Sequence, residues 1–359
     1  MPLLFVLSIE CRFNRPKSFG SNTKKRKDFD VVSAYIKLTL KRIGLITSGG
    51  DAPGMNAGIR AAVRAATGRG VAVTGFYNGY DGILGDKSIE LTSKAVGGII
   101  TMGGTMLRSA RSSEFRTDEG RAKAAANLRR LEVEGLVVIG GDGSLTGALK
   151  LWEEHQIPVM GVPGSIDNDI SGTDFSIGFD TAVQTAVGAI DRLRDTAYSH
   201  ERVFVVEVMG RRNGFIALEA GLACGAEAIL IPEVPYSLHE ICDQMQSSAS
   251  RGKKSSIIVV AEGAARASDI KDFIERNTGF EARYLVLGHM QRGGTPSAFD
   301  RVLALRLGAH ASSRLIAGNS GEMVGVDGSK LVSHPLSYVL AHERSVDPEK
   351  LMLAGVMAQ

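Results

Sequence analysis

The sequence predicts an α/β protein in which parallel strands alternate with helices. Two observations indicate this class. Short apolar runs rich in β-branched residues recur along the chain, and stretches with helical spacing of apolar residues separate them. The runs expected to form strands are 43–47, 71–74, 136–139, 157–162, 203–206, 257–260 and 284–287. In such folds ligands bind at the carboxyl ends of the strands.

Chain length predicts two domains. The 359 residues, 44% of them hydrophobic, exceed what one core comfortably holds. No Pro-, Gly- or Ser-rich linker divides them, so the two domains must exchange strands or helices. The helix expected over 180–196 carries Val183, Val187, Ile190 and Leu193 at helical spacing, a stripe that we interpret as core.

The first strand leads into a Gly/Pro loop, 48–54, and then a helix expected over 55–64. This loop lacks the Lys-Ser/Thr ending of a Walker motif and the spacing G-x-G-x-x-G. Neither a P-loop NTPase nor a nicotinamide-binding domain is therefore the natural interpretation.

A second loop, Gly140–Ser144, follows the strand 136–139. Its glycines allow a sharp turn and close approach to a ligand, and Ser144 is expected to cap the helix that includes 147–152. A phosphate would bind at that helix N-terminus, and Asp142 in the turn could hold Mg²⁺. Such turns also serve as plain connectors, so for this loop alone both interpretations stay open.

A third loop, 162–169, contains two carboxylates. In an extended segment Asp167 and Asp169 project to the same side, where one can accept a proton and the other can stay charged near a metal or orient its partner. The alternative is an Asp/Asn-rich turn whose side chains bond their own backbone, and this is the commoner outcome for such a segment alone.

With these loops in place, the chain resembles the ATP-dependent 6-phosphofructokinase family from about Lys41 to Val326. The motifs that carry the resemblance occur in the family's order: 49–56, 141–144, 163–169, 209–211 and 288–294. The resemblance implies transfer of the γ-phosphoryl group of ATP to the 1-hydroxyl of fructose 6-phosphate. It also implies two Rossmann-like three-layer α/β/α domains, with the chain crossing between them.

The resemblance assigns site residues as well. Asp167 corresponds to the catalytic base, Asp169 supports it, Arg211 stabilises the transferred phosphoryl group, and Asp142 belongs to the Mg²⁺ site. The implied ATP contacts are Gly50, Arg111, Ser112, Gly141, Asp142, Gly143 and Ser144. The implied sugar-phosphate contacts are Ser165, Ile166, Asp167, Met209, Gly210, Arg211, Glu262, His289, Met290, Gln291 and Arg292, with Arg202 and Arg283 lent by a neighbouring subunit. Ser165 stands where Thr is common, which keeps the hydroxyl.

Further expectations follow from the same resemblance. The ATP-binding large domain would comprise 41–178 plus 291–341, and the sugar-phosphate-binding small domain 179–290 plus 342–359. A homotetramer of D₂ symmetry is implied, with ADP or phosphoenolpyruvate as an effector. The implied effector residues are Arg60, Arg64, Arg194, Glu227, Arg251 and Lys253, whereas Ser93 stands where the common pattern has Arg.

Three other functions share parts of this sequence pattern. Pyrophosphate-dependent relatives commonly carry an acidic residue at the position of Gly143 and Lys at that of Gly164, so two glycines favour ATP. A non-catalytic regulatory homologue would need a lesion in the catalytic set, which is intact. Kinases of NAD or lipids that share a GGDG loop have no place for the motifs 163–169 and 288–294.

The charge distribution and the cysteine content indicate the cellular setting and argue against some binding partners. The net charge of +3 is uneven: residues 1–42 hold ten basic and three acidic side chains, leaving −4 elsewhere, which argues against nucleic-acid binding by the globular part. Cys11, Cys224 and Cys242 have no metal-ligand spacing, and no apolar run reaches the length of a membrane span, so we expect a reduced, cytoplasmic setting. The extension 1–40 is expected to be a disordered tail or an unused upstream start, ahead of a targeting segment or a basic arm.

Overall fold

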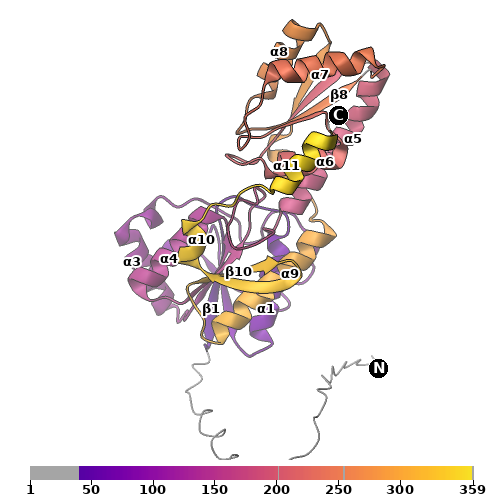
Figure 1. The fold of residues 1–359 in the computed structure, drawn as a ribbon. Helices are drawn as coiled ribbons and strands as arrows, with labels where there is room; N and C mark the ends of the chain where they lie inside the picture. The colour runs from indigo at the N-terminus through magenta and orange to yellow at the C-terminus, as the bar shows by residue number, and fades with distance from the viewer. Residues whose placement is uncertain (1–39, 201, 254, 358–359) are drawn as a thin grey trace, which may run out of the picture. The chain divides into compact units, whose positions relative to one another are not determined.

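The structure, a computed structural model, describes residues 40–200, 202–253 and 255–357, which form two sheets flanked by helices (Figure 1). The first sheet has seven strands in the order β11-β10-β5-β4-β1-β2-β3. Its strands are β1 (Arg42–Ser48), β2 (Ala72–Phe76), β3 (Ser88–Glu90), β4 (Leu136–Gly140), β5 (Val159–Pro163), β10 (Glu322–Asp327) and β11 (Lys330–Pro335). The edge strands β3 and β11 are antiparallel to their neighbours, and the rest pair in parallel.

Helices cover both faces of this sheet because successive strand residues face opposite sides. Leu45 packs into a core cluster that includes side chains of α1 (Met55–Thr67) and α9 (Ala298–Ile316). Its neighbour Ile46 packs into a second cluster, with α2 (Tyr80–Leu84), α3 (Asp118–Arg130) and α4 (Asp142–His155). Figure 1 shows α3 and α4 on one side of β1 and α1 and α9 on the other, so this part has three layers.

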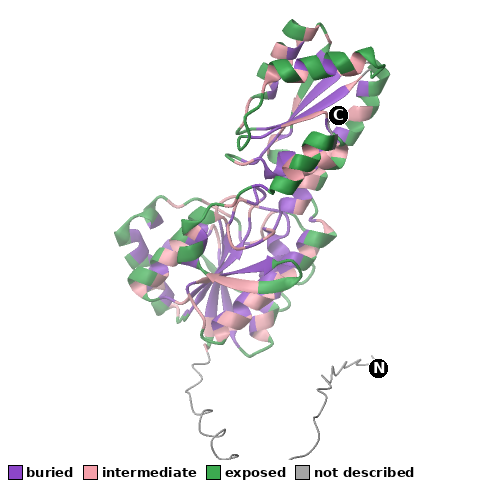
Figure 2. Ribbon diagram, viewed as in Figure 1, coloured by how far each residue is buried: buried purple, intermediate pink, exposed green. Residues whose placement is uncertain are grey.

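The second sheet has four parallel strands in the order β7-β8-β6-β9. They are β6 (Val203–Val208), β7 (Ala228–Leu230), β8 (Ser256–Ala261) and β9 (Ala282–Val286). Val206 shares a cluster with α5 (Phe179–His200) and α6 (Phe215–Cys224), whereas Val205 lies with α7 (Leu238–Ser250) and α8 (Ala267–Thr278). Its inner strands β6 and β8 are buried, the edge strand β9 exposes Arg283, Tyr284 and Val286, and its helices expose their outer faces (Figure 2). This part therefore also has three layers.

The chain passes between the sheets more than once. After β5 it runs through α5 into β6–β9, and it returns through the 3₁₀ turn η3 (Gly288–Arg292) and α9 to β10 and β11. After α10 (Leu336–Ala341) the last helix, α11 (Pro348–Met357), packs on α6, where Lys350 pairs with Glu219. The expected crossing is therefore confirmed. Two further short turns, η1 (Ile99–Thr101) and η2 (Glu114–Arg116), lie between β3 and α3.

All seven expected strands are present, and the sequence missed β3, β7, β10 and β11. Two of these have three residues each, too few for a pattern to emerge. In α5 the expected stripe is partly right: Ile190 is buried, whereas Val183, Val187 and Leu193 are half-buried, because small alanines between them carry the closest packing. Among the described residues no helix combines the length and apolarity needed to cross a membrane. The extension 1–39 and Cys11 lie outside the described residues.

Candidate active site

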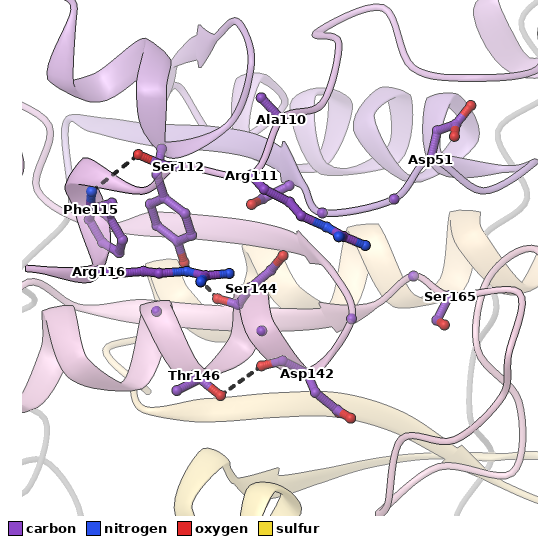
Figure 3. Close-up of a pocket in the computed structure, with 18 of the residues that line it drawn as sticks. Asp51, Ala110, Arg111, Ser112, Phe115, Arg116, Asp142, Ser144, Thr146 and Ser165 are labelled. Atoms are coloured by element: carbon purple, nitrogen blue, oxygen red, sulfur yellow. Dashed lines mark hydrogen bonds between the residues drawn. The ribbon is translucent and has the colours of Figure 1, made fainter. Parts of the chain in front are cut away.

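A cavity of about 400 Å³ opens where three neighbouring strands of the seven-stranded sheet end (Figure 3). Residues Gly49–Asp51 follow β1, Gly141–Ser144 follow β4, and Gly164–Asp167 follow β5; all of them line the cavity. Because β5, β4 and β1 are adjacent and parallel, their carboxyl ends meet at one edge. The topology therefore brings the three loops singled out in the sequence into one site.

Helix α4 begins earlier than expected. Asp142 is its first residue, and extended Gly141 precedes it without a side-chain cap. The predictions that Ser144 caps this helix and that Asp142 lies in the turn are therefore wrong. Ser144 instead sits in the first helical turn, where its carbonyl accepts a hydrogen bond of 2.7 Å from the hydroxyl of Tyr80. Because Gly141 has no side chain to accept from them, the amides of Asp142 and Gly143 keep no capping partner, whereas the Ser144 amide donates to the Gly141 carbonyl at 2.9 Å.

The glycines of this loop serve different purposes. A Cβ at Gly140 would come within 2.5 Å of the Ser48 carbonyl oxygen, so this position needs Gly for packing alone. A Cβ at Gly143 would meet nothing within 4 Å, so the space above it is open to a ligand. Close approach to a ligand thus applies to Gly143 rather than to the whole run.

The segment 110–116 forms another wall of the cavity and carries Arg111 and Ser112 (Figure 3). The Ser112 hydroxyl accepts a hydrogen bond of 3.1 Å from the Phe115 amide, which holds the turn that opens this segment. Together with Gly50 and Gly141–Ser144, all residues expected to contact ATP therefore line one cavity.

Several lining residues escaped the sequence analysis. The Tyr80 and Phe115 rings stack with centroids 3.8 Å apart and planes 12° apart, and both line the cavity, as do Arg116 and Lys150. Buried Arg121 also lines the cavity and donates from Nη2 to Glu154 at 3.0 Å. No motif in the sequence marks these residues.

Asp167 is the most deeply buried acid of the cavity, with 1% of its surface exposed. Its Oδ2 lies 3.1 Å from Nε of Arg211, and its Oδ1 has no hydrogen-bond partner among the described residues. One carboxylate oxygen is thus oriented by a cation, while the other is buried at the cavity wall without a partner among the described residues. That arrangement suits a proton acceptor.

The segment around Asp167 is not extended, so the expected basis for a shared face of Asp167 and Asp169 is wrong. The chain turns at Ile166–Asp167, and Asn168 adopts a left-handed φ of 54°. The Asn168 side chain fixes this turn because its Oδ1 accepts from the Ser176 amide at 2.8 Å. Local turn bonding, the alternative interpretation of this segment, thus describes Asn168, whereas Asp167 lines the cavity and Asp169 is not among the lining residues.

Burial and crowding raise the pKa of two of these carboxyls. The pKa of Asp167 rises to about 6, mainly because burial disfavours the charged form; Arg211 opposes the rise and Asp169 adds to it. The pKa of Asp142 also rises to about 6, through burial and then the charge of Asp169. Three carboxylates share a small volume, which a divalent cation would relieve. Within the described ranges, however, no three His, Cys, Asp or Glu side chains form a metal-binding group of their own.

Some of the residues expected to contact the sugar phosphate join the same cavity. Ser165, Ile166, Asp167, Arg211 and Arg292 line it. The others extend the site from the carboxyl ends of β6 and β8. They are Met209, whose amide donates to Gln291 at 2.9 Å, and Glu262, whose Oε1 accepts from the amides of Gly210 at 3.3 Å and Arg211 at 2.8 Å. His289 and Met290 are exposed on η3.

Arg202 and Arg283 are not brought to this site. Arg202 precedes β6 and Arg283 is the second residue of β9, so both lie at the amino ends of these strands, opposite Met209 and Glu262. Each pairs with the carboxylate of Glu281, at 2.9 Å for Arg202. One copy of the chain therefore leaves them far along the sheet from Asp167.

Comparison with known proteins agrees with this geometry. The family model described as Phosphofructokinase matches residues 42–315. This chain belongs to the phosphofructokinase family. It is 55% identical over 315 residues to the Bacillus subtilis (strain 168) protein named ATP-dependent 6-phosphofructokinase, covering 88% of this chain and 98% of that protein. The Halalkalibacterium halodurans protein of the same name is 53% identical over the same shares.

Solved phosphofructokinases share the fold. The structure of phosphofructokinase from Saccharomyces cerevisiae superposes with a TM-score of 0.79 at 39% identity, over 84% of this chain. This chain spans 45% of that yeast chain, less than half its length. The pyrophosphate-dependent phosphofructokinase from Marinobacter aquaeolei superposes with a TM-score of 0.77 over 86% of each chain, but at 23% identity it supports the fold alone.

In this phosphofructokinase the residues expected to bind an effector fall into two groups. Arg60 and Arg64 lie on α1, and the Nε of Arg60 is buried without a partner among the described residues. Elsewhere Lys253 pairs with Glu227 at 2.8 Å and Arg194 donates to the carbonyl of Gly225 at 3.3 Å, while Arg251 bonds the Ser248 hydroxyl at 3.2 Å. Ser93 lies beside the first group through a 3.0 Å contact between its hydroxyl and that of Thr67.

Proposed function

We propose that this chain transfers the γ-phosphoryl group of ATP to the 1-hydroxyl of fructose 6-phosphate, giving fructose 1,6-bisphosphate and ADP in glycolysis. The observation that carries the proposal is the unpartnered carboxylate oxygen of buried Asp167, a residue that lines the same cavity as the start of α4. The names of the curated relatives point to the same reaction.

In this proposal Asp167 accepts the proton of the 1-hydroxyl through its free Oδ1 while the hydroxyl oxygen attacks the γ-phosphorus and the bond to the ADP oxygen breaks. Arg211 orients the carboxylate at 3.1 Å and offers its remaining guanidinium donors to the transferred group, whose negative charge is spread over three oxygens. Asp169 supports Asp167 as a neighbouring charge. A regulatory homologue without chemistry has no such reason to bury an unpaired carboxylate oxygen.

For the nucleotide, we assign the phosphates to the first-turn amides of α4 at Gly141–Ser144, with Gly50, Arg111 and Ser112 facing them. Tyr80 and Phe115 form a flat apolar surface suited to the nucleoside. Mg²⁺ fits this site because the ion is usually held by one or two carboxylates plus substrate phosphates, and Asp142 stands in a crowd of acids. When bound, the ion would be held by Asp142 and would neutralise charge on the phosphates.

Pyrophosphate is the second candidate donor, and the open space at Gly143 favours ATP over it. A side chain there would project toward the inner phosphate, and Gly143 leaves that volume free. A coupled assay on fructose 6-phosphate with Mg·ATP and with pyrophosphate tests the choice. We expect turnover with Mg·ATP to dominate; greater turnover with pyrophosphate would overturn the proposal.

For the sugar phosphate, we propose the set Ser165, Ile166, Asp167, Met209, Gly210, Arg211, Glu262, His289, Met290, Gln291 and Arg292, completed by Arg202 and Arg283 of a neighbouring copy. Guanidinium and imidazole donors suit a dianionic phosphate. The chain would then act as a homotetramer. We further propose a large domain, 41–178 plus 291–341, for ATP and a small domain, 179–290 plus 342–359, for the sugar phosphate, in a cytoplasmic protein.

An effector site for ADP or phosphoenolpyruvate is proposed at Arg60, Arg64, Arg194, Glu227, Arg251 and Lys253. The loss of a guanidinium at Ser93 should weaken or alter effector preference. We expect ADP or phosphoenolpyruvate to shift half-saturation by fructose 6-phosphate, and Arg60→Ala to reduce the shift, because any coupling must act on the sugar-phosphate equilibrium. No shift with either effector and no change in Arg60→Ala would contradict this site.

A further inference from the structure

The side chain of Arg344 joins two segments that meet at the cavity. Arg344 lies between α10 and α11, beyond the residues 42–315 that the family model matches. Its Nη1 donates a hydrogen bond of 2.9 Å to the main-chain carbonyl of Asn168, and its guanidinium carbon lies 5.1 Å from the centroid of the Phe215 ring. The first contact is in the turn between Asp167 and Asp169. The second is at the first residue of α6.

The Asn168 carbonyl is a sensitive point of the catalytic turn. Asn168 holds a left-handed φ of 54°, a conformation that persists in a non-glycine residue only when its surroundings enforce it. The side chain of Asn168 is fixed by Ser176 at 2.8 Å and by the Asp174 carbonyl at 3.3 Å. Arg344 fixes the main chain of the same residue, and so sets the peptide that separates the two aspartates.

The contact with Phe215 links Arg344 to the segment that carries Arg211, the partner of Asp167. Phe215 opens α6 directly after the turn that contains Arg211, where the Asn213 amide donates to the Gly210 carbonyl at 2.9 Å. The Arg344 guanidinium thus contacts both the segment that carries Asp167 and the segment that follows Arg211. The side chains of Asp167 and Arg211 lie 3.1 Å apart. A cation stacked on an aromatic ring and bonded to a carbonyl is held in a defined orientation.

A purely structural role, fastening the C-terminal segment, is the alternative. That segment has a second anchor, because Lys350 on α11 pairs with Glu219 on α6. Arg344 is itself half-buried, and burial lowers its pKa while Asp174, Glu219 and Asp169 oppose the change. A simple fastener would not need a desolvated guanidinium within the field of Asp169, the neighbour of Asp167 in the catalytic turn.

We propose that Arg344 is a positioning residue for the phosphoryl transfer: it holds the Asp167–Asp169 turn against the start of α6, so that Asp167 and Arg211 keep their mutual geometry. This inference rests on the proposed function. Displacing a reacting group by about 1 Å can cost roughly 100-fold in rate. The loss is expected in turnover, since Arg344 touches neither the nucleotide cavity nor the sugar-phosphate residues directly.

The test compares Arg344→Met with Arg306→Met in the full-length protein. Arg306 is also half-buried and donates to the Ser329 carbonyl at 2.6 Å, so its variant removes a guanidinium-to-carbonyl bond, in a more exposed setting, away from the site. Turnover, half-saturation by ATP and by fructose 6-phosphate, and the melting temperature are measured for both. The unaltered protein is assayed alongside, because its failure to turn over would refute the proposed function rather than the role of Arg344.

Arg344→Met should lower turnover roughly 10- to 100-fold with both half-saturation constants within about threefold of the unaltered protein. Arg306→Met should keep turnover. Arg344→Lys keeps the charge but not the planar fork, and should retain less than about a fifth of the turnover. It replaces the Met variant if that variant does not fold. Turnover of the Arg344 variants within threefold of the unaltered protein, or an equal loss in Arg306→Met, would overturn the proposal.

Discussion

The nucleotide half and the sugar-phosphate half of the candidate site differ in how much of each a single copy of the chain assembles. Every residue expected to contact ATP lines one cavity at the ends of β1, β4 and β5 or in the segment 110–116. The sugar-phosphate half is scattered: five of its residues line the cavity, others lie at the ends of β6 and β8, and Arg202 and Arg283 lie at the opposite end of the four-stranded sheet.

Topology explains the difference. Most of the nucleotide residues directly follow β1 or β4, two adjacent parallel strands, so one sheet edge gathers them, and the segment 110–116 adds Arg111 and Ser112. Arg202 and Arg283 stand at the amino ends of β6 and β9, which no rearrangement of loops could bring to the carboxyl ends of the same strands. A symmetric assembly can, because it sets one face of a copy against a different face of another. The sugar-phosphate half is therefore where association and catalysis should be linked.

The largest effect is expected at the residue that the two halves share. Asp167→Asn keeps the shape of the side chain but cannot accept the 1-hydroxyl proton, so turnover should fall on the order of 10²–10⁴-fold with sugar-phosphate binding nearly unchanged. Steady-state kinetics of the purified variant check this, with Asp180→Asn, outside the cavity, as the control. Near-normal turnover in Asp167→Asn would assign the base elsewhere.

Single arginine variants should separate the halves. Removing a charge-assisted contact with a phosphate costs roughly 1.5–3 kcal/mol, which corresponds to roughly 10- to 100-fold in affinity. Arg283→Ala should therefore raise half-saturation by fructose 6-phosphate by that factor and leave that of ATP unchanged, whereas Arg111→Ala should do the reverse. Arg276→Ala, an exposed helix residue, serves as the control. A single variant that weakens the binding of both substrates equally would contradict the separation of the site into a nucleotide half and a sugar-phosphate half.

The pH dependence should follow the raised pKa of Asp167. Its folded-state pKa of about 6 lies above the ordinary value of 3.8, so the carboxylate protonates as pH falls through 6 and can no longer accept a proton. Turnover should fall about tenfold for each pH unit below that value. A turnover profile that stays flat down to pH 5 would show that no group with this pKa governs the step.

The contribution of Asp167 to stability should change with pH in the direction opposite to turnover: it should become more favourable as pH falls. A carboxyl with a raised folded-state pKa destabilises the protein above that pKa, and the cost disappears as pH falls to the unfolded value. Asp167→Asn removes the buried charge, so at pH 7 the free energy of unfolding should rise by roughly 1–3 kcal/mol. Thermal unfolding at pH 7 and pH 4 should show the gain at the first pH and its absence at the second. A variant less stable at pH 7 would contradict the stated cost.

Glycine-containing loops that follow apolar strands explain why much of the fold and of the candidate site could be predicted from the sequence. The loops 48–54, 140–144 and 162–169 each interrupt an apolar strand, and parallel pairing then fixes where they meet. The helix start at Asp142 was missed because extended Gly141 caps without a side chain, and the turn at Asn168 was missed because its partner Ser176 lies eight residues away. Arg344 is 176 residues from the carbonyl that it holds, a separation at which no local pattern gives a signal.

The most direct test of the division into a self-sufficient half and a shared half mixes two variants. Arg283→Ala retains its own Asp167, and Asp167→Asn retains Arg283 to lend. The two are produced together, so that copies associate at random, and assayed at the fructose 6-phosphate concentration that half-saturates the unaltered protein. If each site borrows Arg283 from a neighbour, roughly a quarter of the sites regain an intact pair, and the mixture should recover roughly a quarter of normal turnover. A mixture no more active than the sum of its two components, or a fully active monomer in sedimentation, would contradict the shared site.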